Sequence, residues 1–334
     1  MTGAAILGCA GPRLSDDERK FFADARPWGF ILFARNVETP DQIRALTDEL
    51  RGAVGTNAPI LIDQEGGRVQ RLRPPHWRLW PPPLEQTRAA GSRAGRAMFL
   101  RCRIIADELA ALGIDVDCAP LADIADAGTH PFLRNRCYGE DAATVIEVGR
   151  AAAQGLAAGG VMPVLKHAPG HGRARTDSHS EAPRVEDSAE MLRARDFAPF
   201  RALSDLPMAM TAHVVFAAFD GKLPATVSPT MIGLIRDEVG FDGLLMTDDI
   251  SMNALPGGLA ERCSASLSAG CDAVLHCNGD MAEMETVAAV VGEFSGRSAE
   301  RAERALAGRP APDGVDIASA EAELGALLKG EAHG

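Results

Sequence analysis

The stretch 162–183 carries one lysine, one aspartate, three histidines and a Pro- and Gly-containing segment, and its residue types and spacing are suited to acid–base chemistry. Lys166 and His167 stand side by side after a short apolar run, where a strand is expected to end. Prolines and glycines follow and predict a loop that bends around a ligand. On that loop, Asp177 and His179 have Asp-x-His spacing, so the carboxylate is able to accept an imidazole N–H and fix the tautomer that faces a substrate.

Two adjacent carboxylates, Asp248 and Asp249, come directly after the apolar run GLLMT. Neighbouring residues of a strand point to opposite sides, so we expect one carboxylate to face a pocket and the other to support it. An aspartate after a strand is also a common helix N-cap, and this is the role that we expect for Asp249. Asp248 is therefore the candidate for chemistry.

The segment PILIDQEGGRVQRL places Asp63 at another predicted strand end, with Arg71 further along the same segment. A carboxylate is able to accept two sugar hydroxyls at once, and a guanidinium that returns to the same pocket is a fork-shaped donor. The alternative is that Asp63 and Glu65 pair with Arg68 and Arg71 only to close the loop. Spacing does not decide between these two interpretations.

Other polar residues also allow more than one role. Arg136, in the segment LRNRCYGED, is a candidate ligand-binding residue, although surface arginines are far commoner. Lys166 and His167 could form a buried ion pair and a satisfied core histidine, but their place beside a Gly-rich loop favours recognition of a polar ligand. Several histidines near Asp177 suggest a metal site as an alternative to acid–base chemistry. We rank the metal site second because no H-x-H or H-E-x-x-H motif places two imidazoles together. We expect no cofactor.

Short apolar runs alternate with longer helical patterns, which favours an α/β protein with a parallel sheet covered by helices. The predicted strands are Ala4–Gly8, Gly29–Phe33, Pro59–Ile62, Ile114–Asp117, Val161–Lys166, Pro207–Ala212, Gly243–Thr247 and Asp272–His276. The predicted helices are Asp16–Ala25, Pro40–Val54, Arg93–Leu112, Ala142–Ala158, Ala189–Leu203, Pro229–Val239, Leu259–Ala269 and Met281–Glu293. Eight strands suffice to close a TIM-type (β/α)8 barrel. The competing open doubly wound sheet has no G-x-G-x-x-G motif after its first strand to support a dinucleotide site.

Polar residues fall at the C-terminal ends of these strands, which in a barrel converge on the face that carries the active site. They are Asp63, Asp117, Lys166, His167, His213, Asp248 and Cys277, and Asp117 and His213 are the weaker candidates among them. Further helical signals after Ser298 and Ala318 are expected to pack on the outside of the barrel. We therefore predict one domain, with a barrel at about 1–295 and a C-terminal helical extension at 296–334.

Composition narrows the class of protein. The 334 residues are 46% hydrophobic, which is enough to bury a large core, but no apolar run approaches the ~20 residues that span a bilayer. Seven cysteines without a C-x-x-C pair indicate reduced thiols, and the first residues lack a basic group before their apolar stretch, so we expect a cytoplasmic protein. A net charge of -12 repels phosphate backbones and argues against nucleic acid. We expect a monomer that acts on a small molecule.

Three segments resemble a known family. KHAPGHGRARTDSH is similar to the K-H-x-P-G-H-G-x-x-x-x-D-S-H signature of the bacterial β-N-acetylhexosaminidases of glycoside hydrolase family three, the NagZ type. IDQEGGRVQRL and MTDDISM resemble the other two hallmark segments of that family, in the same order and at plausible separations. The resemblance runs from about Gly29 to about Cys277, which is most of the chain.

The resemblance implies a single (β/α)8 barrel that removes β-linked N-acetylglucosamine (GlcNAc) from the non-reducing end with retention of configuration. It implies that Asp248 is the nucleophile and that His179, assisted by Asp177, is the acid/base. Sugar binding is implied for Asp63, Arg71, Arg136, Lys166 and His167. The implied substrates are GlcNAc-1,6-anhydro-N-acetylmuramic acid and its peptide-bearing forms, in peptidoglycan recycling.

A histidine acid/base is chemically reasonable. A retaining glycosidase needs an ionised nucleophile and a proton donor beside the leaving oxygen, and an imidazole with a pKa of about 6.5 is able both to give and to take a proton at cytoplasmic pH. Because His179 lies on a Gly- and Pro-containing loop, we expect this loop to close on the substrate. The rival functions are a family-three β-glucosidase or xylosidase, a GlcNAc phosphorylase with phosphate as acceptor, a metal-dependent barrel hydrolase and a non-catalytic sugar sensor.

Overall fold

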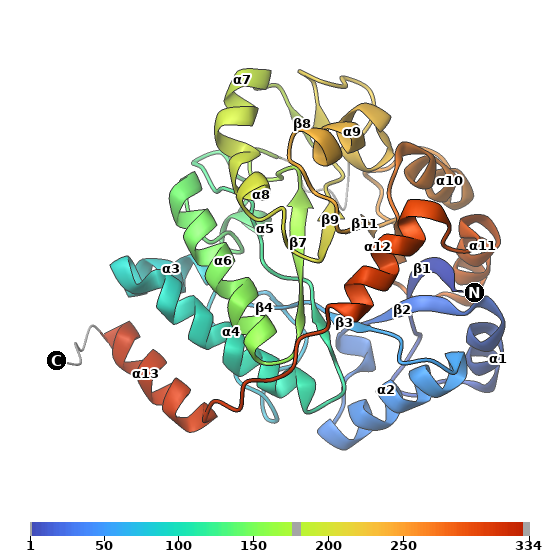
Figure 1. The fold of residues 1–334 in the computed structure, drawn as a ribbon, viewed down its shortest axis with the longest axis horizontal. Coiled ribbons are helices and arrows are strands. Elements are labelled where there is room, and N and C mark those ends of the chain that lie inside the picture. The colour runs from blue at the N-terminus through green and yellow to red at the C-terminus, as the bar shows by residue number, and fades with distance from the viewer. Residues whose placement is uncertain (1, 176–181, 330–334) are drawn as a thin grey trace.

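The computed structural model describes residues 2–175 and 182–329, so Asp177 and His179 lie outside the described residues. Within these ranges, eight parallel strands close into a barrel that is surrounded by helices (Figure 1). In their order around the barrel the strands are β1 (Gly3–Gly8), β12 (Ala273–His276), β11 (Leu244–Asp249), β9 (Met208–Thr211), β7 (Met162–Ala168), β6 (Val116–Asp117), β3 (Ile60–Ile62) and β2 (Pro27–Leu32). Each overlaps a predicted strand, and the predicted α/β barrel is confirmed.

The barrel strands are apolar on both faces because both faces are covered, as expected for a parallel sheet. Ile6, Leu61 and Val164 belong to one cluster inside the barrel. Their neighbours in sequence include Leu7 and Ile62, which pack instead with the surrounding helices. All five side chains are fully buried, and burial of each contributes about 1.5–3 kcal/mol.

Helices connect the strands and begin at capping residues that the sequence supplies. The side chain of Ser15 accepts a hydrogen bond from the backbone N–H of Glu18 at 3.1 Å, and the side chain of Glu18 caps in return. The helices of the barrel layer are α1 (Asp16–Ala25), α2 (Pro40–Val54), α4 (Ala94–Ala110), α6 (Ala142–Ala158), α8 (Ala198–Ala202), α9 (Pro229–Asp237), α10 (Leu259–Ala269) and α11 (Met281–Val291). Shorter helices occur in the connections: α3 (Pro83–Ala90), α5 (Pro131–Arg134) and α7 (Ala189–Met191).

The helix predicted over residues 189–203 is present but is not one continuous α-helix, so the prediction is wrong in that respect. It consists of α7, a π-helical turn at Leu192–Asp196 and α8. Pro199 has no N–H to donate to the carbonyl group of Arg195, so a regular α-helix cannot run through this position.

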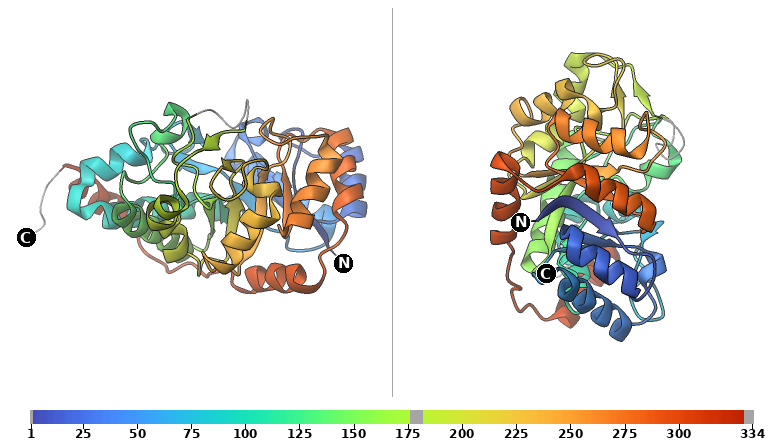
Figure 2. Two further views of the ribbon diagram at one scale, coloured as in Figure 1. Left: turned by 90° about the horizontal axis from the view of Figure 1, so that it is seen from above. Right: turned by 90° about the vertical axis from the view of Figure 1, so that its right-hand side faces the viewer.

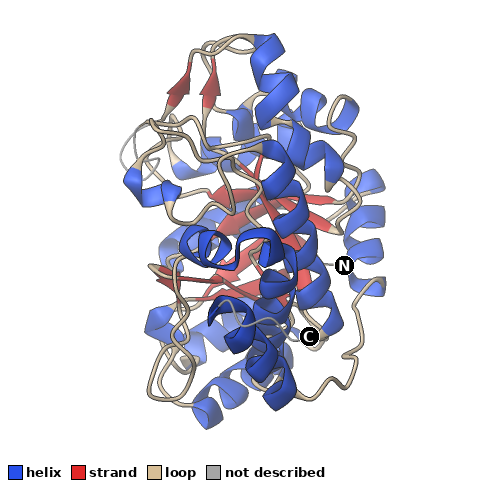
Figure 3. Ribbon diagram, turned by 90° about the vertical axis from the view of Figure 1, so that its left-hand side faces the viewer, coloured by secondary structure: helices blue, strands red, loops and turns tan. Residues whose placement is uncertain are grey.

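Two small strand pairs were not predicted. β4 (Gln64–Gly66) and β5 (Val69–Gln70) form an antiparallel pair directly after β3. Gly66 in this pair has φ of 99°, and a Cβ atom there would overlap the guanidinium of Arg101, so the position requires glycine. β8 (Arg184–Val185) pairs with β10 (Val215–Phe216), and Figure 3 shows this pair standing apart from the barrel strands.

Two helices follow the barrel, and α12 (Gly296–Ala307) covers the N-terminal end of the strands. Figure 2 shows it beneath the barrel in the left-hand view. Its small side chains Ala302 and Ala305 belong to the cluster of residues inside the barrel. Arg301 fixes the helix in place, because it pairs with Asp242 at 2.7 Å and with Asp272 at 3.1 Å, just before β11 and β12. The last helix, α13 (Ile317–Lys329), packs against α4 and α3.

Candidate active site

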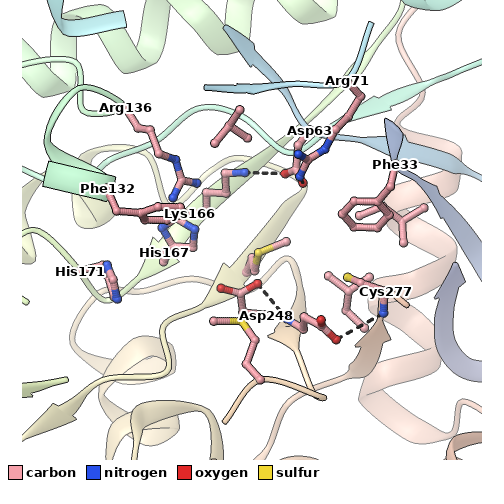
Figure 4. A pocket seen from close by; sticks show the side chains of 16 residues that line it. Phe33, Asp63, Arg71, Phe132, Arg136, Lys166, His167, His171, Asp248 and Cys277 are labelled. Atoms are coloured by element: carbon pink, nitrogen blue, oxygen red, sulfur yellow. Dashed lines mark hydrogen bonds and ion pairs between the residues drawn. The ribbon is translucent and has the colours of Figure 1, made fainter. Parts of the chain in front are cut away.

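A cavity with about 730 Å³ of empty space, counted to its open mouth, lies at the C-terminal ends of the barrel strands. This is the face on which barrel enzymes carry their chemistry. Predicted residues that line it are Asp63, Arg71, Arg136, Lys166, His167 and Asp248. Lining residues that were not singled out for binding are Ile31, Phe33, Val69, Phe132, Met210, Met252 and Leu275. Figure 4 shows these side chains converging from different strands.

Lys166, at the end of β7, reaches the carboxylate that follows β3. Its Nζ lies 2.8 Å from Asp63 Oδ1, and an Arg71 guanidinium nitrogen lies 2.8 Å from Asp63 Oδ2. Burial by itself raises the pKa of Asp63, but Lys166 and Arg71 outweigh it and hold the carboxyl group ionised, well below its ordinary range. The predicted loop-closing pair of Asp63 and Arg71 therefore exists, and it stands inside the pocket.

Glu65, on β4, ties two of the predicted sugar-binding cations together. It accepts two parallel hydrogen bonds from the Arg136 guanidinium, both at 2.8 Å, and its Oε1 lies 2.7 Å from Lys166 Nζ. Its side chain has no solvent exposure. Burial raises the pKa of Glu65, but Arg136 and Lys166 lower it more, so the carboxylate is charged. Glu65 therefore pairs with two cations distant in sequence and not with Arg68 or Arg71, the alternative that spacing had left open.

Asp248 lies in the pocket opposite Lys166 and Asp63 (Figure 4). Burial raises its pKa, but His167 and His213 nearby, the backbone N–H of Asp249 and Lys166 together lower it below the ordinary value. The Asp249 N–H donates to Asp248 Oδ1 at 2.8 Å. The pocket therefore holds an ionised and oriented carboxylate, the form that a nucleophile needs.

Asp249 is not the helix N-cap that the sequence suggested, because α10 begins after Gly258. Its carboxylate instead accepts hydrogen bonds from Ser251 Oγ at 2.8 Å and from the backbone N–H groups of Ser251 and Cys277 at 3.2 and 3.3 Å. This is a turn that ties the end of β11 to the end of β12. Asp249 therefore supports the position of its neighbour Asp248.

Asp123, a buried residue after β6, orients the histidine of the pocket. Its Oδ2 lies 2.8 Å from His167 Nδ1, and its Oδ1 accepts the backbone N–H of His171 at 2.6 Å. Because an ionised carboxylate only accepts, Nδ1 of His167 carries the proton. Burial raises the pKa of Asp123, but His167 and His171 outweigh it. Burial also lowers the pKa of His171 to about 4, so this imidazole is neutral at pH 7.

Asp117 and His213, the weaker candidates, do not line the pocket. Asp117 lies beneath it and accepts the backbone N–H of Gln64 at 2.9 Å, and burial raises its pKa to about 7. His213 Nε2 lies 3.0 Å from the carbonyl oxygen of Asp249, and its Nδ1 lies 2.7 Å from Thr226 Oγ1. Burial lowers the pKa of His213, and because a carbonyl oxygen only accepts, its Nε2 carries the proton that is donated to the backbone beside Asp248.

Two phenylalanines bound the pocket on opposite sides of the Lys166–Asp63 pair (Figure 4). Phe33, after β2, has the Arg71 guanidinium carbon 4.9 Å from its ring centre. Phe132, on α5, has the Arg136 guanidinium carbon 5.2 Å from its ring centre. Cation–π contacts of this kind fix the aromatic rings as apolar walls beside a polar floor. Such a mixed lining suits a sugar, which has both hydroxyl groups and C–H faces.

Across residues 2–175 and 182–329, no group of three or more His, Cys, Asp or Glu side chains is arranged to hold a metal ion. In the same ranges, no helix combines the length and apolar character needed to cross a membrane. The predicted acid/base pair, Asp177 and His179, lies outside the described residues.

A closed α/β barrel with an ionised aspartate, paired cations and aromatic walls at the C-terminal ends of its strands is typical of a barrel enzyme with a polar substrate such as a sugar. The family described as "Glycosyl hydrolase family 3 N terminal domain" matches residues 5–306, and the chain belongs to this family.

Curated relatives and solved structures agree with this assignment. A β-hexosaminidase of Alkalilimnicola ehrlichii is 38% identical over 292 residues, which are 83% of this chain and 81% of the relative. A β-hexosaminidase of Methylococcus capsulatus is 36% identical over 308 residues, 91% of each chain. The crystal structure of native NagZ from Neisseria gonorrhoeae superimposes with a TM-score of 0.84 at 31% identity and covers 100% of this chain and 98% of that one. Another structure of that protein, with a TM-score of 0.83 at 31% identity over 98% of this chain and 96% of that one, holds N-trifluoroacetyl-D-glucosamine. The chain is therefore a hexosaminidase-type glycosidase.

Proposed function

We propose that this protein is a retaining exo-β-N-acetylglucosaminidase with Asp248 as its nucleophile. The observation that carries the proposal is the position of Asp248, an ionised carboxylate at the end of β11 that faces the linked charges of Asp63, Lys166 and Arg136 across one cavity. A sugar held by those charged groups presents its anomeric carbon to a carboxylate fixed on the other side.

The pocket charges support the recognition of a sugar. Carboxylate oxygens of Asp63 accept hydrogen bonds from sugar hydroxyl groups, while Lys166, Arg71 and Arg136 donate hydrogen bonds to hydroxyl and carbonyl oxygens. Each of these groups is already held by a partner, so little conformational entropy is lost on binding. The related gonococcal structure with bound N-trifluoroacetyl-D-glucosamine supports an N-acylated glucosamine as the ligand.

The reaction proceeds in two steps. Asp248 Oδ forms a bond to C1 while the bond from C1 to the leaving oxygen breaks, and His179 gives its proton to that oxygen. Water then attacks C1, His179 takes the proton, and the ester to Asp248 breaks, which releases GlcNAc with its original configuration. Asp177 orients His179 and stabilises its charged form.

The substrate that we propose is GlcNAc-1,6-anhydro-N-acetylmuramic acid, with or without its peptide, during peptidoglycan recycling in the cytoplasm. Seven free and buried cysteines support a reducing compartment. We further propose that the protein works as a monomer on this small molecule, without a metal or cofactor.

A time course with 4-nitrophenyl N-acetyl-β-glucosaminide tests the function. We expect release of GlcNAc that is unchanged by a chelator, together with much slower hydrolysis of the matched 4-nitrophenyl β-glucoside and β-xyloside. Sugar phosphate as the product in phosphate buffer would instead indicate a phosphorylase. Loss of activity with chelator would indicate a metal-dependent hydrolase, and tight binding of GlcNAc without turnover would indicate a sensor.

A further inference from the structure

A second cavity adjoins the pocket on the side of Phe132. It has about 470 Å³ of empty space and is lined by Arg68, Pro82, Pro131, Asn135 and Arg136. Arg136 lines both cavities, so they are neighbours. The proposed mechanism leaves this second cavity without a role.

The path of the chain indicates that this is the side on which the aglycone, the part of the substrate that leaves, is held. His171 lines the pocket on the same side as Phe132 (Figure 4). The segment after His171 is hydrogen-bonded to the residues before Phe132, since Thr129 Oγ1 donates to the carbonyl oxygen of Gly172 at 2.6 Å. The backbone N–H of His130 also donates to the carbonyl oxygen of Ala174 at 3.2 Å, so the described chain up to this point lies on the Phe132 side. The proposed acid/base residue follows five residues later in the sequence, and a general acid must act beside the leaving oxygen.

Arg68 presents an available positive charge at this place. Its guanidinium carbon lies 4.1 Å from the centre of the Phe132 ring, and its side chain is exposed. No carboxylate in the part of the chain that the structure describes forms an ion pair with Arg68, whereas Arg136 is held by Glu65. Stacking on Phe132 restricts the guanidinium, so less entropy is lost when it binds a carboxylate with two hydrogen bonds.

The charge of the protein makes such a group useful. The chain carries a net charge of -12, which disfavours the approach of an acidic molecule. A positive group beside the second cavity offsets this repulsion where the aglycone is held.

We propose that Arg68 and Phe132 form an aglycone subsite that recognises a carboxylate on the leaving sugar or on its peptide. This inference rests on the proposed function and extends it to the group released. It makes Arg68 a specificity-determining residue. The effect of Arg68 on kcat/KM depends on the charge of the aglycone, and its side chain takes no part in cleavage of the glycosidic bond.

The test compares Arg68→Gln with the wild type on three β-glycosides of GlcNAc that share one aglycone sugar. The first carries a free lactyl carboxylate, the second its neutral methyl amide, and the third an acidic dipeptide on the same position. We expect Arg68→Gln to lower kcat/KM for a carboxylate-bearing form about tenfold relative to the methyl amide, as loss of one charge-assisted contact predicts. A loss on the first or third substrate also identifies which carboxylate is bound.

Controls separate local recognition from long-range charge and from misfolding. Arg44→Gln on α2 removes an equal charge from another exposed arginine, and we expect it to leave the ratio of the two kcat/KM values unchanged. Added NaCl should reduce the wild-type preference for the charged aglycone but not that of Arg68→Gln.

An equal effect of Arg68→Gln on all three substrates, or no effect, would overturn the subsite. If the wild type releases no GlcNAc even from the 4-nitrophenyl glycoside, it is the proposed function that fails.

Discussion

Glu65 holds Arg136 with two parallel 2.8 Å hydrogen bonds and contacts Lys166 at 2.7 Å, while its own side chain is shielded from solvent. The two cations thus take their positions in the pocket from a carboxylate that never meets the solvent.

Glu65→Gln should raise KM for the 4-nitrophenyl substrate at least tenfold and change kcat much less. The glutamine amide is nearly isosteric with the glutamate carboxylate, but its NH2 group is a hydrogen-bond donor that would face two cations. Loss of one charge-assisted hydrogen bond at a buried site costs about 1.5–3 kcal/mol. Steady-state kinetics and calorimetric binding of GlcNAc measure this effect. Glu108→Gln, which breaks the ion pair with Arg78 away from the pocket, is the matched control and should alter only thermal stability. A lower Tm of Glu65→Gln without any change in KM would make Glu65 purely structural.

Asp248→Ala should lower kcat by on the order of 10⁴-fold, because the covalent route is lost. Sodium azide should restore part of the turnover and yield a glycosyl azide of inverted configuration, since a small anion takes the place of the missing carboxylate. Asp249→Asn should lose far less, because an amide oxygen is still able to accept the N–H groups of Ser251 and Cys277. Near-normal activity of Asp248→Ala would contradict its role as nucleophile.

Asp123→Asn should lower kcat/KM by about two orders of magnitude. The amide oxygen is able to keep the backbone N–H of His171, but its NH2 then faces His167 Nδ1 and forces the other tautomer. NMR of imidazole nitrogens labelled with ¹⁵N reports the tautomer directly. If His167 keeps its proton on Nδ1 in an active variant, Asp123 does not fix its tautomer.

His179→Ala should spare substrates with good leaving groups much more than those with poor ones. A nitrophenolate departs without a proton, whereas a sugar alkoxide needs one from a general acid. A series of aryl glycosides of graded leaving-group acidity gives the slope of log kcat/KM, which should become steeper in the variant. Equal losses across the series would remove His179 as the proton donor.

Asp117→Asn should be more stable than the wild type at neutral pH, by a margin that grows from about pH 4 to about pH 7 and then levels off. Burial raises the pKa of Asp117 from 3.8 to about 7, so between these values the folded protein holds a proton that the unfolded chain has released. The stability contributed by this group therefore falls as pH rises through that window, by up to about 1.4 kcal/mol per pH unit. Urea unfolding of both proteins at several pH values measures the difference, in which other titrating groups cancel. A difference that does not vary with pH would contradict the raised pKa.

The barrel was predictable from sequence because its strands are short apolar runs that end in polar residues. Both faces of a strand such as β7 (Met162–Ala168) are covered, so its burial depends little on which other strands pair with it. Asp63, Lys166 and Asp248 follow such runs, and convergence of strand ends brings them to one cavity without knowledge of the loops.

The supporting residues were not predictable, because their partners are distant in the chain. Glu65 meets Arg136 across 71 residues and Asp123 meets His167 across 44, whereas spacing alone suggested only neighbours within one loop. His213 stands at a strand end, yet it bonds to a backbone carbonyl group because Thr226 and Asp249 occupy both of its nitrogens. The position of a residue at a strand end predicts that it lies near the mouth of the barrel. Its hydrogen-bond partners depend on which distant segments the folded chain brings beside it.

All the charged residues that line the pocket precede Gly296, whereas α12, which begins at that residue, shields the opposite end of the barrel. A chain shortened to 295 residues would thus retain all the pocket-lining residues, yet it would leave Ile6, Trp28 and their inward-facing neighbours without the cover of Ala302 and Ala305. Substitutions in α12 should therefore change the stability of the barrel without replacing any residue that lines the pocket.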